Sequence, residues 1–82
     1  MREFWTIHIA RDVARFIYTL PRGQVTELRD ALALLRSEPR PEGAKRLVIE
    51  ELDNIYAIKL GQYRIEYQMI EQDRIIRILL VE

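Results

Sequence analysis

Lys59 and Arg64 are the two side chains of this sequence whose type and spacing best suit binding chemistry. They flank the dipeptide Gly61-Gln62, and glycine at the first position of a two-residue loop is typical of a type II′ β-hairpin. In that register Lys59 lies directly opposite Arg64 on one face of the hairpin. Because opposed like charges are destabilising, the pair indicates a site for an anion such as phosphate. The alternative is that both side chains extend into solvent and that Glu66 neutralises them.

Three further sets of residues are candidates for a site. Arg77 is predicted to lie on the same face as that pair, which makes it a third candidate phosphate-binding residue. His8 has the chemistry of an acid or base, but the sequence places no serine, cysteine or second histidine beside it, and a solvent-facing strand histidine is the simpler interpretation. An arginine also recurs every seven residues, which suits either a nucleic-acid backbone or a solvated helix face. These arginines are Arg22, Arg29 and Arg36.

Composition restricts the class of protein without identifying it. The chain has 82 residues, enough for one modest domain, and 49% of them are hydrophobic. Lys+Arg and Asp+Glu both number 13, so the net charge gives no indication of a nucleic-acid partner. All but two of the cations are arginine, which suits forked recognition of phosphate or carboxylate, although such enrichment also arises as a compositional habit of the source organism.

Several classes of site and location are excluded by what the sequence lacks. It contains no cysteine, so it predicts neither disulfides nor a thiolate metal site. With a single histidine, we expect no metal and no cofactor. No apolar run has the length of a membrane span, and the N-terminus lacks the apolar segment of a signal peptide. We therefore expect a cytoplasmic protein with no membrane partner.

Hydrophobic periodicity places the elements that must position these residues. The N-terminal segment alternates as a half-buried strand does, and the period then changes to that of two amphipathic helices. Pro21 ends the first helix, and residues 38–43 form a breaker rich in proline and glycine. Residues 44–53 are ambiguous between a strand and a loop. The predicted elements are a strand over 4–9, helices over 11–20 and 24–37, and strands over 55–60, 63–70 and 75–81.

A second predicted hairpin tests the register of the first. A two-residue loop at Gln72-Asp73 would set Tyr67 opposite Ile78 and Ile65 opposite Leu80, which extends one apolar face across three strands. The same register puts three aliphatic residues on the charged face. Either another chain covers them, as in a homodimer, or the sheet edge is exposed. These residues are Ile75, Leu79 and Val81.

The order of these elements defines a fold class. Two consecutive amphipathic helices need one surface to bury against, and the apolar face of the sheet is available. The sequence therefore predicts an α+β fold, a two-layer sandwich in which both helices pack on one face of an antiparallel sheet in the order β-α-α-β-β-β. Residues 1–82 form a single domain in this prediction.

Within this order of elements, four segments give the chain a resemblance to the RelE/ParE superfamily of bacterial and archaeal toxins. The likeness spans almost the whole chain, and the third and fourth segments are its most specific parts. The segments are Trp-Thr-Ile at 5–7, Leu-Pro at 20–21, Pro-Arg-Pro-Glu-Gly-Ala-Lys-Arg-Leu at 39–47, and Ile-Tyr-Ala-Ile-Lys-Leu-Gly-Gln-Tyr-Arg-Ile-Glu-Tyr at 55–67.

The resemblance implies the toxin of a type II toxin–antitoxin module, whose partner is a small antitoxin that wraps it. RelE-like members cleave mRNA in the ribosomal A site without a metal, because the RNA's own 2′-hydroxyl attacks the adjacent phosphate, whereas ParE-like members poison DNA gyrase. Cations then steady the phosphorane charge while a base and an acid move protons. Lys59 matches the second lysine of the family's lysine-x-lysine strand and Arg64 the arginine after the turn tyrosine, so the resemblance implies catalytic roles for both.

Two departures from the family pattern limit the expected activity. The family's first lysine position is Ala57 here, and its further arginine and proton-transfer residue lie after the last strand, where this sequence stops at Glu82. Electrostatic donors contribute about 10²–10³-fold each and acid–base groups about 10²–10⁴-fold, so we expect weak or absent RNA cleavage. The alternative is a non-catalytic member, either a gyrase inhibitor or a degenerate toxin that only binds its antitoxin.

Overall fold

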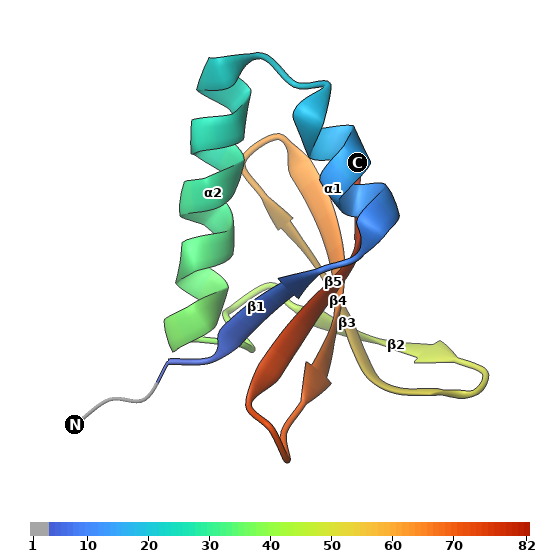
Figure 1. The fold of residues 1–82 in the computed structure, drawn as a ribbon. Helices are drawn as coiled ribbons and strands as arrows, with labels where there is room; N and C mark the ends of the chain where they lie inside the picture. The colour runs from blue at the N-terminus through green and yellow to red at the C-terminus, as the bar shows by residue number, and fades with distance from the viewer. Residues whose placement is uncertain (1–3) are drawn as a thin grey trace.

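Residues 4–82 are described by the computed structural model, and they form two helices and a five-stranded sheet (Figure 1). Both helices pack on one face of the sheet, here called the helix face, and the opposite face is called the outer face. The predicted α+β sandwich is confirmed. The elements are β1 (Thr6–Ile9), α1 (Arg11–Tyr18), α2 (Arg22–Ser37), β2 (Lys45–Ile49), β3 (Leu52–Leu60), β4 (Tyr63–Ile70) and β5 (Ile75–Val81).

The connection between the helices begins two residues earlier than the sequence predicts. Thr19 closes α1, because its backbone N–H and its hydroxyl both donate to the carbonyl of Phe16, at 3.0 and 2.6 Å. Pro21 caps the start of α2, where its missing N–H is tolerated. The first helix therefore ends at Tyr18 and the second begins at Arg22. Neither helix of the described residues has the length and hydropathy needed to cross a bilayer.

The sheet is mixed, which corrects the prediction of an antiparallel sheet. Its strand order is β1-β5-β4-β3-β2, and β1 runs parallel to β5 at one edge. Four strands follow the helices instead of three, because the ambiguous segment forms β2 at the other edge. A parallel pair needs a long crossover connection, and the pattern within β1 carries no information about so distant a partner.

The hairpin around Gly61-Gln62, formed by β3 and β4, has the predicted register. Lys59 pairs with Arg64 and Tyr56 with Tyr67. Gly61 has φ +60°, as a type II′ turn requires, whereas Gln62 does not have a positive φ. Lys59 and Arg64 are both exposed on the outer face. The residues directly before and after each of them in β3 and β4 face the helices.

The second hairpin keeps its predicted register only in part. Its loop contains the four residues 71–74, and Tyr67 pairs with Ile78 as predicted. Ile65 pairs with Val81, so the predicted pairing of Ile65 with Leu80 is wrong. A β-bulge causes the shift, because Leu79 is an extra residue without a partner in β4. The bulge also corrects the predicted position of Val81, which turns into the core and is 5% exposed.

The core lies between the helices and the helix face of the sheet. Each helix contributes one apolar stripe, and Tyr67 is the largest fully buried side chain opposite them. The Tyr67 hydroxyl donates to the carbonyl of Pro39 at 2.6 Å, which ties the loop before β2 to the sheet. The buried members of the core are Val13, Leu28, Leu32, Leu35, Ile58, Tyr63, Ile65, Tyr67, Met69, Ile76, Ile78 and Val81.

Candidate functional site

Three charged side chains form one row across the outer face, at the end of the sheet near the Gly61 turn. Lys59 of β3 pairs with Arg64 of β4. Arg64 exchanges both backbone hydrogen bonds with Glu82, at 2.7 and 3.0 Å, so Glu82 lies directly opposite it on the far side. The row therefore reads lysine, arginine, glutamate, and it confirms that Lys59 and Arg64 are brought together on one face.

The guanidinium of Arg64 is held by two carboxylates. Its Nη1 atom contacts an oxygen of Glu66 at 2.5 Å and an oxygen of Glu82 at 3.3 Å. Glu66 was the residue expected to neutralise the pair, and Glu82 adds a second acceptor. Both carboxylates bind the same nitrogen, while Nε and Nη2 of Arg64 make no hydrogen bond with residues 4–82. These two atoms form the forked edge of the guanidinium that can donate to two oxygens of one phosphate.

These carboxylates also keep Arg64 charged. The pKa of Arg64 is raised, chiefly by the side-chain hydrogen bond with Glu66, and the charges of Glu66 and Glu82 add to this, whereas desolvation opposes it. Arg64 is therefore a permanent cation with a fixed orientation. Lys59, by contrast, makes no ion pair within the described chain.

A third cation lies beside the pair. Lys45 of β2 pairs with Ala57 of β3. Ala57 precedes Lys59 by two residues, so both point to the outer face. The side chains here surround a hollow of about 260 Å³, called the hairpin hollow below. The sequence did not reveal Lys45 as a site residue because it falls in the segment that was ambiguous between strand and loop. The hollow is lined by Gly43, Lys45, Leu47, Ala57, Ile58, Lys59 and Arg64.

Arg77 and His8 lie elsewhere on the outer face. Arg77 pairs with Gln68 on one side and with His8 on the other. Gln68 is four residues from Arg64 along β4, which corresponds to about 13 Å at 3.3 Å per residue. The structure therefore does not bring Arg77 to Lys59 and Arg64. His8 is exposed, as expected of a solvent-facing strand histidine.

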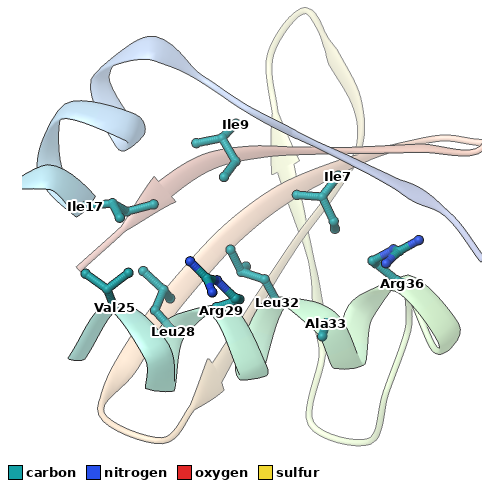
Figure 2. Close-up of a pocket in the computed structure, with 9 residues that line it drawn as sticks. All are labelled: Ile7, Ile9, Ile17, Val25, Leu28, Arg29, Leu32, Ala33 and Arg36. Atoms are coloured by element: carbon teal, nitrogen blue, oxygen red, sulfur yellow. The ribbon is translucent and has the colours of Figure 1, made fainter. Parts of the chain in front are cut away.

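A second concave surface, the helix groove, lies between β1 and the two helices and has a volume of about 340 Å³ (Figure 2). Its walls are mainly aliphatic, and two arginines of the predicted seven-residue row, Arg29 and Arg36, enter it from α2. Arg36 is fixed there, because its Nε donates to the carbonyl of Trp5 at 3.1 Å and its guanidinium lies 5.5 Å from the ring centre of Phe4. The lining residues are Ile7, Ile9, Ile17, Val25, Leu28, Arg29, Leu32, Ala33 and Arg36.

The described residues offer no site for a metal ion. Within residues 4–82 there is no group of three or more histidine, aspartate or glutamate side chains with the geometry to hold one. The charged groups that line the hairpin hollow are instead the ammonium groups of Lys45 and Lys59 and the guanidinium of Arg64. Such a set can bind an anion.

Comparison with solved structures identifies the fold. The chain resembles the archaeal RelE–RelB complex from Pyrococcus horikoshii OT3 with a TM-score of 0.80 and 23% identity, over 96% of this chain and 93% of that one. For the toxin–antitoxin complex RelBE2 from Mycobacterium tuberculosis the TM-score is 0.79 with 24% identity, over 96% of each chain. For the isolated E. coli RelE toxin the TM-score is 0.74 with 22% identity, over 94% of this chain and 81% of that one.

These likenesses show that the chain has the fold of RelE toxins. They confirm the structural part of the resemblance predicted from the sequence. No protein-family model and no curated protein sequence matches the chain.

Proposed function

We propose that this protein is the toxin of a type II toxin–antitoxin module and that it cleaves RNA in the manner of RelE, at a reduced rate because Ala57 stands at the family's first lysine position. The observation that carries the proposal is the set of three cations, Lys45, Lys59 and Arg64, around one hollow of a RelE-like sheet. A scissile phosphate in this hollow would meet the ammonium of Lys59 and the forked edge of Arg64. Both cations then oppose the negative charge that develops on the phosphorane.

The carboxylates beside Arg64 have a positioning role in this proposal. Glu66 and Glu82 hold Nη1 of Arg64 and leave Nε and Nη2 for the substrate. A guanidinium that is already oriented loses less conformational entropy when a phosphate binds. Attack by the neighbouring 2′-hydroxyl restricts the reaction to RNA, because DNA lacks that nucleophile.

Incubation of the purified chain with programmed ribosomes tests this function. We expect mRNA to be cut within the codon held in the A site, as mapped by primer extension, and a matched DNA oligonucleotide to stay intact. In cells, expression of the chain is expected to arrest growth with the appearance of the same cleavage ends. Growth arrest with intact mRNA, relieved by a resistant gyrase, would instead establish a gyrase inhibitor and exclude RNA cleavage as the cause.

The antitoxin of such a module would occupy the helix groove. Its aliphatic walls fit the apolar side of an amphipathic segment, and Arg29 and Arg36 provide cations for acidic side chains on that segment. The similar RelBE2 structure is itself a complex of a toxin with an antitoxin. The proposal therefore assigns one surface to the antitoxin and another, on the opposite face of the sheet, to RNA.

Substitution of Ala33 by glutamate tests the groove. Ala33 is exposed and lines the groove, so a glutamate there adds bulk and an unpaired carboxylate to the docking surface without entering the core. We expect the affinity for the antitoxin of the module to fall by about 30-fold or more, as for loss of an interface hot spot, when measured by isothermal titration calorimetry.

The matched control for this variant is Leu34→Glu. Leu34 is the next residue of α2 and is 60% exposed, but it does not line the groove. We expect its affinity to stay within about twofold of the unmodified chain. Equal losses for Ala33→Glu and Leu34→Glu would contradict the assignment of the groove.

A further inference from the structure

The strand β2 forms one edge of the sheet and has an open side. It pairs with β3, and no other strand of the described residues pairs with it. Figure 1 shows the β2–β3 hairpin projecting away from both helices. Val48, the last residue but one of this strand, is 99% exposed. An exposed edge of this kind is a template for another strand.

The hydrogen-bonding pattern of the sheet fixes which residues of β2 present their backbone groups to the open side. Arg64 exchanges both backbone bonds with Glu82, which directly follows β5, so its N–H and C=O point toward β5. Backbone groups alternate in direction along each antiparallel strand. With the observed registers, the odd-numbered residues of β2 bond to β3, and the even-numbered residues, Arg46 and Val48, direct their N–H and C=O outward.

The sequence of this edge is complementary to itself. Residues 45–51 read Lys-Arg-Leu-Val-Ile-Glu-Glu, so the charge changes sign across the central valine. Two copies placed antiparallel about a two-fold axis at Val48 would set every charge opposite its counter-charge. The pairs within both strands are Val48 with Val48 and Leu47 with Ile49. Beyond them Arg46 and Lys45 of one copy face Glu50 and Glu51 in the turn of the other.

Other registers are excluded by geometry or by charge. A shift of one residue would bring an outward-facing residue of one copy against an inward-facing residue of the other, so no ladder could form. A two-fold axis at Arg46 sets two arginines against each other, and an axis at Leu47 pairs Lys45 with Ile49 and leaves every charge unmatched. The axis at Val48 is therefore the register that satisfies both conditions.

The charges of this edge have no other partners within the described chain. No ion pair of residues 4–82 includes Lys45, Arg46, Glu50 or Glu51, and all four are exposed. An edge protected against pairing commonly carries charges of one sign, which repel a second copy. Here two cations precede Val48 and two carboxylates follow it, so an antiparallel second copy is attracted. Glu50 and Glu51 form the turn after β2, so their carboxylates lie at the end of the edge where the partner's cations would arrive.

We propose that two copies of this chain associate through their β2 strands, antiparallel about a two-fold axis at Val48, so that two five-stranded sheets form one continuous sheet. This interface satisfies the isologous rule that each contact occurs twice. One pair of short strands buries less than the ~1,200 Å² typical of stable complexes, so the dimer forms in a concentration-dependent manner. The inference is independent of the proposed toxin activity.

Charge exchange across the axis tests the proposed register. In Arg46→Glu the introduced carboxylate would lie against Glu50 of the other copy, twice in each dimer, and Glu50→Arg would set two arginine pairs in opposition. Each single variant is expected to weaken dimerisation by about tenfold or more, because two attractive pairs become repulsive. An equimolar mixture of the two variants, and the double variant Arg46→Glu with Glu50→Arg, are expected to recover the affinity of the unmodified chain.

Sedimentation equilibrium over about 10 µM to 1 mM, a range that covers weak dimers, measures each of these affinities. Arg15→Glu is the matched control, because Arg15 is exposed on α1, away from β2, and should not change the dimer. Val48→Pro removes the central outward N–H from an edge position, where proline is tolerated, and is expected to be a folded monomer by circular dichroism. A monomeric unmodified chain at 1 mM, or a dimer that either single charge variant or the folded Val48→Pro variant leaves intact, would overturn the proposal.

Discussion

Replacement of Lys59 and Arg64 by alanine is expected to abolish RNA cleavage while leaving the fold intact. Each cation is proposed to oppose the charge of the phosphorane, and loss of one such donor typically reduces the rate by about 10²–10³-fold. Both side chains are exposed on the outer face, so neither substitution creates a cavity. Because the two cations lie directly opposite each other, their removal also relieves a like-charge contact. Single-turnover cleavage on programmed ribosomes measures the loss, and thermal unfolding checks the fold.

Two further variants separate the roles within the site. Glu66→Gln removes the main partner of Arg64 Nη1 without removing a cation, so we expect a smaller reduction, of about tenfold, from the loss of a fixed guanidinium. Arg15→Ala removes an exposed arginine from α1 and is expected to cleave at the unmodified rate. Cleavage that survives in the Lys59→Ala, Arg64→Ala double variant would show that the hairpin hollow is not the catalytic site. A faster Glu66→Gln variant would show that the carboxylates compete with phosphate instead of positioning Arg64.

The second large effect concerns stability at alkaline pH. Tyr67 is fully buried, and burial is the first cause that raises its pKa to about 12, with a smaller contribution from Tyr56 and an opposing one from Arg40. The neutral phenol is thus preferred in the folded protein. The stability that Tyr67 contributes is fully present below its unfolded pKa of about 10 and is lost as the pH rises toward 12. The difference between these two pKa values corresponds to a loss of about 2 to 3 kcal/mol.

Urea unfolding of the unmodified chain and of Tyr67→Phe, at about pH 8 and about pH 11.5, isolates this effect. At the lower pH the phenylalanine variant is expected to be less stable by about 1 kcal/mol, because it loses the hydrogen bond to the Pro39 carbonyl. At the higher pH this difference is expected to vanish or reverse. Tyr18→Phe, at a position that is 88% exposed, is the control and should lose stability in parallel with the unmodified chain. Parallel losses in Tyr67→Phe would contradict the assignment to Tyr67.

The sequence predicted the local parts of the fold and missed the non-local ones. The turn chemistry of Gly61 determines the register of its hairpin, so the pairing of Lys59 with Arg64 followed from a few adjacent residues. The run from residue 75 to 81 is apolar at almost every position, so alternation could not reveal the bulge at Leu79. The parallel pairing of β1 with β5 depends on residues at opposite ends of the sequence.

For the candidate site too, the sequence predicted the local part and missed the contributions of distant strands. Its two central cations belong to the hairpin and were identified. Lys45 reaches the hollow from β2 and Glu82 reaches Arg64 from the end of β5, and the registers of these two strands were unknown or wrong. Arg77 shares the face that the alternation predicts, but its distance from the pair depends on the order of strands. The helix groove depends on how β1 and the helices meet, which no single stretch of sequence specifies.

The parallel edge of the sheet has a consequence for biosynthesis. Thr6 pairs with Ile75, and 69 positions separate these residues along the chain (75 minus 6). During translation, β1 is made before β5 and has no partner strand in the sheet until residues 75–81 have followed it. Loop closure over such a separation is slow compared with formation of the β3–β4 hairpin. The sheet therefore cannot be completed before β5 has been made, and β1 joins it as a late step of folding.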